Sequence, residues 1–227
     1  MVINNEAGMD LEAVKILEKL YNTVLGESSE LNLSGFKGIK IIFDSSLPPI
    51  SDGRLEDKIL LLPRNKIQRY LHLGNYDIIK STIHHELCHV DLANKLPFLH
   101  ELLNDYMKEE NYIKGFTIMI YIEYVVHLKS KKFETFENKI VFFESVNNKK
   151  WNFNNDVDKV MFIKVSPYIL GRDTDSNYLK SVINIELKNR LLEIKKEFEK
   201  LPTIALIDNY RLLEGLERLV SEYVSND

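Results

Sequence analysis

The chain of 227 residues has a single cysteine, Cys88, and no surplus of basic residues. One cysteine excludes an internal disulfide framework and is typical of proteins from a reducing compartment. The formal net charge is −4, and lysines and arginines are scattered, usually beside acids. Such a charge balance gives no indication of a basic surface that would bind nucleic acid. We therefore expect a protein with no nucleic-acid partner.

Long hydrophobic runs are also missing. The longest, residues 116–126, is broken by Glu123 and falls well short of the roughly 18 residues that a membrane span needs. The first twenty residues lack the basic segment, apolar stretch and small-residue cleavage site of a signal peptide. We also find no internal repeat and no low-complexity tract. We therefore expect a cytoplasmic protein without a membrane partner, in which residues 116–126 form a buried helix.

The hydrophobic content of 44% is enough for a real core in one large domain, or in one domain with an appendage. β-Branched and aromatic runs predict two short strands, at 39–43 and 58–62. Apolar spacing at helical period predicts helices over 10–25, 76–94, 98–109 and 112–129, and two long amphipathic helices over 178–200 and 204–224, joined at Pro202.

Near residue 130 the composition changes from a mixed α and β half to an almost wholly helical half rich in Lys, Glu and Asn. This change predicts a domain over residues 1–130 and a helical C-terminal region over 131–227. The fold class is then α+β, mostly helical with a small β-sheet, plus an all-α C-terminal extension. The extension would cover a cleft, bind a partner or mediate dimerisation, and the sequence leaves the oligomeric state open.

The predicted helix over 76–94 contains the motif His85-Glu86-Leu87-Cys88-His89. Residues four apart on a helix are separated by about 40° around its axis, so the two histidines share one face and can bind one Zn²⁺. Glu86 lies beside that face, where its carboxylate could take a proton from water and pass it to a leaving amine. A chance match is the alternative, but the helical setting after a small sheet favours a zinc site. The motif therefore predicts His85 and His89 as ligands and Glu86 as general base.

A catalytic zinc site needs a third protein ligand and leaves its fourth position to water. Glu123 is the strongest candidate, because it lies in a helix that is apolar nearly all round, where an unpaired carboxylate would be costly. The alternatives are a buried Glu123 paired with a lysine or arginine, or a Glu123 at a solvated rim. The rival ligands lie in polar surroundings and rank lower; they are Glu101, Glu109 and Glu110.

Three residues near Glu123 are candidates for a supporting role. His127 lies one turn beyond it on the same face and could contact a ligand, donate to a developing oxyanion or be the third ligand itself. The alternative is a partly exposed histidine at the helix end without a role in the site. Tyr121 and Tyr124 could supply the same oxyanion donor, although tyrosines in an apolar helix usually belong to the core. The sequence does not decide among these three residues.

The remaining histidines and the cysteine are weaker candidates. His84 points about 100° away from His85 around the helix, which favours a packing role. Cys88 is better explained as a small buried hydrophobe than as a ligand. His72 and His100 have no supporting neighbours.

The segment Ile83-His84-His85-Glu86-Leu87-Cys88-His89, preceded by a short sheet and followed 34 residues after His89 by Glu123, resembles the compact gluzincin metallopeptidases. Among them the chain is most similar to the ImmA/IrrE-type proteins, and the resemblance covers roughly residues 10–130. It implies a zincin-like fold with His85, His89 and Glu123 as zinc ligands. One departure is His127, since gluzincins often have an acid four residues after the glutamate ligand.

The expected function is that of a zinc metalloendopeptidase that hydrolyses peptide bonds in a cytoplasmic protein or peptide substrate. A rival hypothesis is a zinc-stabilised regulatory or interaction protein, which would be favoured by a fourth side chain on the metal, such as Cys88 or His127. A third is a metal-free pseudoenzyme that holds a peptide in its cleft. The sequence does not identify the substrate.

Overall fold

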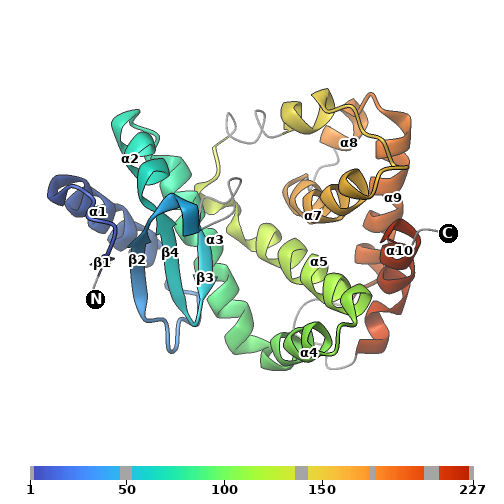
Figure 1. Ribbon diagram of the computed structural model, residues 1–227, viewed down its shortest axis with the longest axis horizontal. Helices are drawn as coiled ribbons and strands as arrows, with labels where there is room; N and C mark the ends of the chain where they lie inside the picture. Colours follow the sequence, from blue (N-terminus) through green and yellow to red (C-terminus); the bar gives the residue numbers. More distant parts are fainter. Residues whose placement is uncertain (1–2, 47–52, 136–142, 174–176, 202–209, 225–227) are drawn as a thin grey trace. The chain divides into compact units, whose positions relative to one another are not determined.

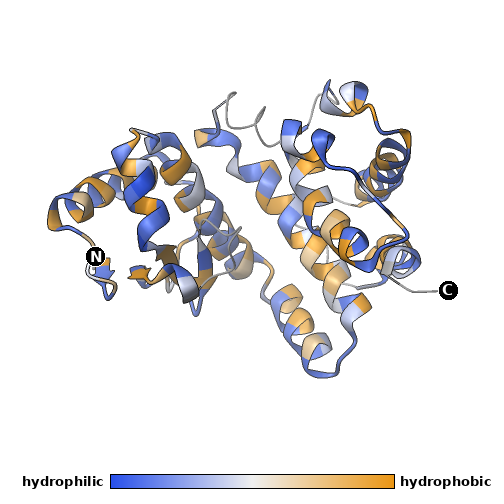
Figure 2. Cartoon of the chain, turned by 45° about the horizontal axis from the view of Figure 1, so that its top comes forward, coloured by the Kyte–Doolittle hydropathy of each residue, from blue (hydrophilic) through white to orange (hydrophobic). Residues whose placement is uncertain are grey.

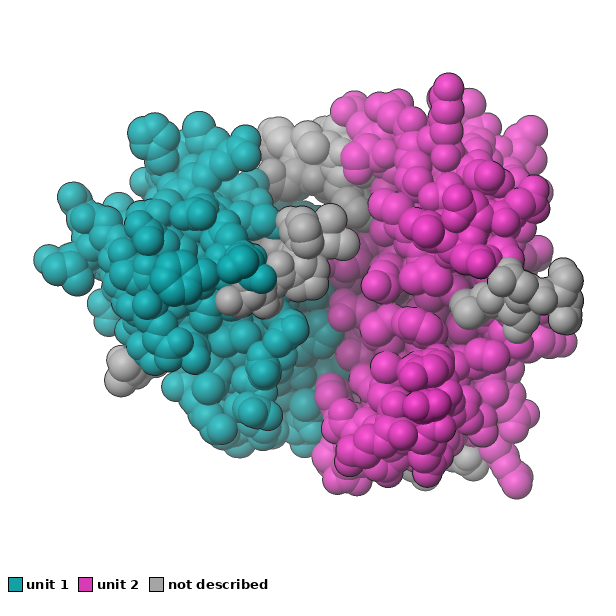
Figure 3. Space-filling model, in the orientation of Figure 1, with its two compact units in different colours: residues 1–94, 129–135 teal, residues 95–128, 136–227 magenta. Residues whose placement is uncertain are grey.

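The computed structural model describes residues 3–46, 53–135, 143–173, 177–201 and 210–224. The chain forms two compact units, coloured separately in Figure 3: unit 1 comprises residues 1–94 and 129–135, and unit 2 comprises residues 95–128 and 136–227. The described residues are mostly helical with one small mixed sheet, which confirms the predicted α+β class. The domain boundary at residue 130 and the zincin-like fold stay predictions.

Unit 1 contains a four-stranded sheet with the order β1-β2-β4-β3. Its strands are β1 (Ile3–Asn5), β2 (Gly38–Ile42), β3 (Arg54–Glu56) and β4 (Ile59–Pro63). β2 pairs in parallel with both β1 and β4, and β3 pairs antiparallel with β4 (Figure 1). The two central strands are the two that the sequence predicts. β1 and β3 escape prediction because each has three residues, two of them polar or charged.

A tight turn joins β3 to β4. Asp57 and Lys58 both have positive φ, at 49° and 61°, as a type I′ hairpin turn requires. Residues other than glycine rarely adopt this backbone conformation. The ammonium group of Lys58 donates to the Ser34 carbonyl at 3.2 Å and to Asn94 Oδ1 at 2.8 Å. These bonds help to hold the turn and fasten it to the chain near residue 94.

Three helices complete unit 1: α1 (Leu11–Glu27), α2 (Arg64–His72) and α3 (Tyr76–Lys95), the last residue of α3 belonging to unit 2. The Asp10 carboxylate caps the start of α1, because it accepts hydrogen bonds from the backbone amides of Glu12 and Ala13. Polar and apolar residues alternate around α1, as Figure 2 shows. α3 buries Ile79, Ile83 and Leu87 in the core shared with α1, β2 and β4. This burial fixes which way the rest of α3 faces.

In unit 2 the described residues form helices and no strand. α4 (Pro97–Lys108) is followed by α5 (Tyr112–Lys129), as predicted, and the 3₁₀-helix η2 (Ser130–Phe133) then returns the chain to unit 1. Residues 143–148 are also helical. The remaining elements are α7 (Asp156–Arg172), α8 (Asn177–Ser181), α9 (Ile185–Lys200), η4 (Tyr210–Leu213) and α10 (Glu214–Val224). α10 packs against α7 and α9.

The predicted single helix over 178–200 is wrong. The chain leaves the helical conformation after Ser181, and a new helix begins at Ile185. Asn184 causes the restart, because its Oδ1 accepts a hydrogen bond from the Leu187 amide at 2.9 Å and so caps α9. In the predicted helix over 204–224, the α-helix begins only at Glu214, while residues 204–209 and Pro202 lie outside the described residues.

α5 and α7 approach each other closely at Gly171. A Cβ at this position would lie 2.5 Å from the Cβ of His127 and 3.0 Å from the Tyr124 carbonyl oxygen. Only a residue without a side chain fits such a contact. The close packing of α7 on the C-terminal half of α5 therefore depends on this glycine.

No helix in the described parts of the chain combines the length and apolar character needed to cross a bilayer.

Candidate metal centre

His85 and His89 lie one turn apart on α3, and their rings face each other. The two Nε2 atoms are 3.2 Å apart, with ring centroids separated by 4.9 Å. Two nitrogens that bind one tetrahedral zinc ion, each at roughly 2.05 Å, lie about 3.3 Å apart. The spacing of the two nitrogens is that of two ligands on one zinc ion, and also that of a hydrogen bond between the two rings.

The second ring nitrogen of His85 lies beside Ser130. His85 Nδ1 is 3.4 Å from Ser130 Oγ, and Ser130 is buried in η2 with 5% of its surface exposed. A ligand histidine usually donates its other N–H to a neighbouring acceptor, which fixes the ring. The Ser130 hydroxyl can accept that N–H or donate to an unprotonated Nδ1. Sequence reasoning does not find Ser130, because no periodicity or motif connects it with His85.

The rest of the motif is buried. Glu86 is 9% exposed, and Cys88 is fully buried and forms no disulfide. His84 is 2% exposed and packs edge-on against Phe133, with ring centroids 5.0 Å apart. Burial lowers the pKa of His84, which favours its neutral form. These positions fit the predicted packing roles of His84 and Cys88.

A buried carboxylate two residues beyond His89 holds this end of α3. Asp91 is fully buried, and its Oδ1 accepts from the Asn32 amide at 2.7 Å. Its Oδ2 accepts from the Lys129 ammonium at 2.9 Å. Asp91 was not singled out from the sequence, because its partners are 59 and 38 residues away along the chain. The network fixes the helix that carries both histidines.

Glu123 and His127 lie together on α5 in unit 2. Glu123 Oε2 is 3.6 Å from His127 Nε2, with 29% of the Glu123 side chain exposed and the His127 side chain fully buried. The His127 ring also packs against Tyr168 of α7, with centroids 3.6 Å apart. Glu123 thus has a histidine neighbour rather than the lysine or arginine of one alternative, and its partial exposure is closer to the other alternative, a glutamate at a solvated rim.

The two tyrosines have different surroundings. Tyr121 is 2% exposed, and burial raises its pKa to about 12. Tyr124 stacks flat on Phe198 of α9, with centroids 3.9 Å apart, and burial raises its pKa as well. Tyr121 belongs to the buried core, whereas Tyr124 is partly buried. The role of either hydroxyl as an oxyanion donor stays a prediction.

Each unit contributes one pair of possible metal ligands: His85 and His89 on α3 in unit 1, and Glu123 and His127 on α5 in unit 2. The two pairs include the three predicted ligands and add His127, whose role the sequence leaves open. The assignment of the metal as zinc stays a prediction.

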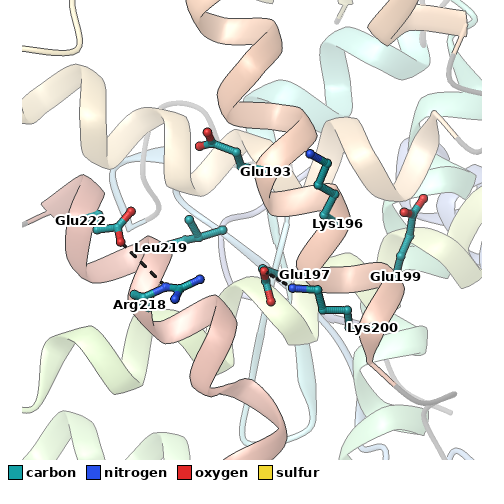
Figure 4. A pocket seen from close by; sticks show the side chains of 8 residues that line it. All are labelled: Glu193, Lys196, Glu197, Glu199, Lys200, Arg218, Leu219 and Glu222. Atoms are coloured by element: carbon teal, nitrogen blue, oxygen red, sulfur yellow. Dashed lines mark hydrogen bonds and ion pairs between the residues drawn. The ribbon is translucent and has the colours of Figure 1, made fainter.

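A surface pocket in unit 2 has a different character (Figure 4). It lies between α9 and α10, and its lining of four glutamates, two lysines, an arginine and a leucine includes no histidine. Its charges largely neutralise one another, as in the pairs Lys200–Glu197 at 2.6 Å and Arg218–Glu222 at 3.9 Å. The pocket contains none of the predicted site residues.

Comparison of the chain with protein-family models, with curated proteins and with solved structures gives no match.

Proposed function

We propose that the protein is a zinc-dependent metallopeptidase that cleaves a cytoplasmic protein or peptide substrate. The observation that carries the proposal is the 3.2 Å separation of His85 Nε2 and His89 Nε2, which matches the spacing of two nitrogens on one zinc ion. Glu123 is the proposed third ligand. A zinc ion with an open position supplies Lewis acidity, which polarises a scissile carbonyl and activates water.

The remaining roles in the proposed reaction belong to residues of the chain itself. Glu86 accepts the proton of the attacking water and transfers it to the nitrogen of the leaving amine. His85 and His89 present their Nε2 atoms from a helix whose opposite side is fixed in the core by Ile83 and Leu87. The Asn32–Asp91–Lys129 network holds the end of that helix. The two rings are thus held in place before any ligand binds.

The experiment compares wild-type protein with Glu86→Gln. We expect both to retain one equivalent of zinc, and only the wild type to cleave a peptide library read out by mass spectrometry. Glu101→Gln is the matched control, because Glu101 is an exposed glutamate on α4 and a rival ligand. Cleavage by Glu86→Gln at the wild-type rate would contradict the role of Glu86, and loss of zinc from Glu101→Gln would contradict the ligand assignment.

A second candidate is a zinc-stabilised regulatory or interaction protein. It is favoured by His127, whose Nε2 lies 3.6 Å from Glu123 Oε2 and which could therefore serve as a fourth protein ligand. A site closed by four protein ligands has no position for water. X-ray absorption of the zinc-loaded protein separates the two candidates. Two imidazole ligands with the remaining positions filled by oxygen favour the peptidase. Three imidazole ligands favour the closed site.

A further inference from the structure

Helix α7 places an aromatic side chain on the histidine of the α5 pair. The ring of Tyr168 packs on the buried ring of His127, with centroids 3.6 Å apart. His127 Nε2 in turn lies 3.6 Å from Glu123 Oε2. All three residues belong to unit 2, so the arrangement is internal to one unit. A phenol of the C-terminal region therefore adjoins the candidate ligands of α5.

The packing of α7 on α5 fixes the position of Tyr168. Gly171 follows Tyr168 by three residues and so lies on the same side of α7. A Cβ at Gly171 would lie 2.5 Å from the Cβ of His127, so the two helices are in direct contact at this point. This contact holds the Tyr168 ring against His127.

Helix α7 has an irregularity immediately before Tyr168. Pro167 lies inside the helix and is buried. A proline there removes the amide that would bond to the carbonyl of Ile163, four residues earlier, and typically costs about 3 kcal/mol or more. The Ser166 hydroxyl donates to the Ile163 carbonyl at 3.1 Å instead. Such departures from local preference are expected at functional positions, and this one adjoins Tyr168.

Two other tyrosines close to Glu123 in the sequence are placed differently. Tyr121 is two residues before Glu123, so it points about 160° away from it around the helix axis. Tyr124 stacks flat on Phe198, with centroids 3.9 Å apart. Tyr168 differs from both, because it is partly exposed and its ring contacts the residue one turn from Glu123.

A positive charge lies beside the same ring. The guanidinium carbon of Arg172 is 4.9 Å from the centroid of the Tyr168 ring. Arg172 is four residues beyond Tyr168 and therefore on the same side of α7. Positive charge near a developing oxyanion stabilises it. The surroundings of Tyr168 thus combine a hydroxyl donor with a nearby cation.

We propose that Tyr168 is a catalytic residue whose hydroxyl donates a hydrogen bond to the scissile carbonyl oxygen of the substrate as that oxygen becomes an oxyanion. The inference rests on the proposed function. When the water oxygen bonds to the carbonyl carbon, the π electrons move onto the carbonyl oxygen, which accepts the hydrogen bond. The C=O bond then re-forms as the C–N bond breaks, and the leaving nitrogen takes the proton held by Glu86. Tyr168 keeps its own proton throughout.

The first test is Tyr168→Phe, which removes the hydroxyl and keeps the ring on His127. Loss of one oxyanion donor typically costs about 100- to 1,000-fold in kcat, and we expect about 100-fold with KM little changed. Zinc content and melting temperature should equal those of the wild type. Tyr178→Phe is the matched control, since Tyr178 is also a stacked tyrosine of unit 2, with its ring 4.1 Å from that of Phe143. It should leave kcat unchanged.

The second test measures binding without turnover. A phosphinic peptide built on the cleaved sequence has a tetrahedral anionic group in place of the scissile carbonyl and so resembles the transition state. Calorimetry should show that Tyr168→Phe binds it roughly 100-fold more weakly than the wild type does. The substrate peptide itself, measured in the Glu86→Gln background, should bind equally well with and without Tyr168→Phe. Equal weakening of both peptides would indicate a structural role and overturn the proposal.

The outcomes separate this inference from the proposed function. If the wild type cleaves no peptide, both proposals fail. If the wild type cleaves and Tyr168→Phe keeps the wild-type kcat, the peptidase stands and the role of Tyr168 is wrong. A loss of zinc from Tyr168→Phe in proportion to its loss of activity would also overturn that role, as would a loss of kcat in Tyr121→Phe or Tyr124→Phe instead.

Discussion

The helices α3 and α5 each carry two candidate ligands four residues apart, but they are held in different ways. α3 has an apolar face in the core of unit 1, and polar contacts fix its other residues, as Asp91 with Lys129 and His85 with Ser130 illustrate. α5 is buried on most sides, and its candidate residues pack within unit 2 against rings and backbone. The contacts to Tyr168 and Gly171 are examples.

The two pairs of candidate ligands therefore depend on different surroundings. Polar contacts on α3 are directional, so they can orient a particular ring nitrogen. On α5 the His127 ring packs against Tyr168, and its Nε2 lies 3.6 Å from Glu123 Oε2, so packing and polar contacts act together there. Substitutions of the candidate ligands should therefore alter metal binding first, and substitutions of the packing contacts around α5 should alter stability first.

The largest effect is expected for His89→Ala. Removing one imidazole of the pair should lower zinc affinity by more than the roughly hundredfold that an outer partner contributes. Chelator competition measures the loss. The matched control is His72→Ala, since His72 is an exposed histidine at the end of α2 and should leave zinc affinity unchanged. Equal affinities for the two variants would contradict the assignment of His89.

The next effect is expected for Asp91→Ala, which removes the buried partner of the partly exposed Lys129 and leaves the Asn32 backbone amide without its acceptor. Losing these hydrogen bonds should lower the free energy of unfolding by about 2 kcal/mol. Urea denaturation followed by circular dichroism measures the change. Asp91→Asn keeps a hydrogen-bond acceptor and should lose less, so a larger loss in Asp91→Asn would contradict the role assigned to the pair.

On α5, Gly171→Ala should destabilise unit 2, because the new Cβ would lie 2.5 Å from the Cβ of His127. Forcing an extra carbon into a packed contact typically costs about 1–3 kcal/mol. Gly26→Ala is the control, since a Cβ there meets nothing within 4 Å, and alanine should stabilise α1 slightly. Thermal melts distinguish the two, and equal melting temperatures would show that the helices separate at little cost.

The smallest effect is expected for Phe198→Leu. It removes the flat stack with Tyr124, whose centroids lie 3.9 Å apart, but keeps most of the apolar volume. Losing the aromatic stack, apart from any change in buried apolar area, should lower the free energy of unfolding by about 1 kcal/mol. Zinc affinity should be unchanged. A large fall in zinc affinity from this variant would show that steric contacts on α5 control the metal site as strongly as the polar contacts on α3.

Much of the helical structure could be predicted from the sequence. The apolar spacing of residues 76–94 and 112–129 persists over several turns, so it determines both the existence and the approximate ends of α3 and α5. The break at residues 182–184 could not be predicted, because the apolar spacing continues across it. The cap supplied by Asn184 decides the break instead.

The candidate site could be predicted only in part. His85 and His89 follow from local spacing, because a helix brings residues four apart together. Ser130 and Asp91 could not be found in this way. Ser130 reaches His85 only after the chain has passed through α4 and α5, a separation of 45 residues. Contacts of this kind depend on how η2 returns to α3, which no local pattern encodes.

The most direct test of the central claim is metal analysis of purified protein, by mass spectrometry of the native protein and by elemental analysis. The account predicts one equivalent of zinc in the wild type and none in the double variant His85→Ala/His89→Ala, with both proteins folded by circular dichroism. A zinc-free wild type that also fails to bind added zinc would contradict the account, as would a double variant that retains a full equivalent.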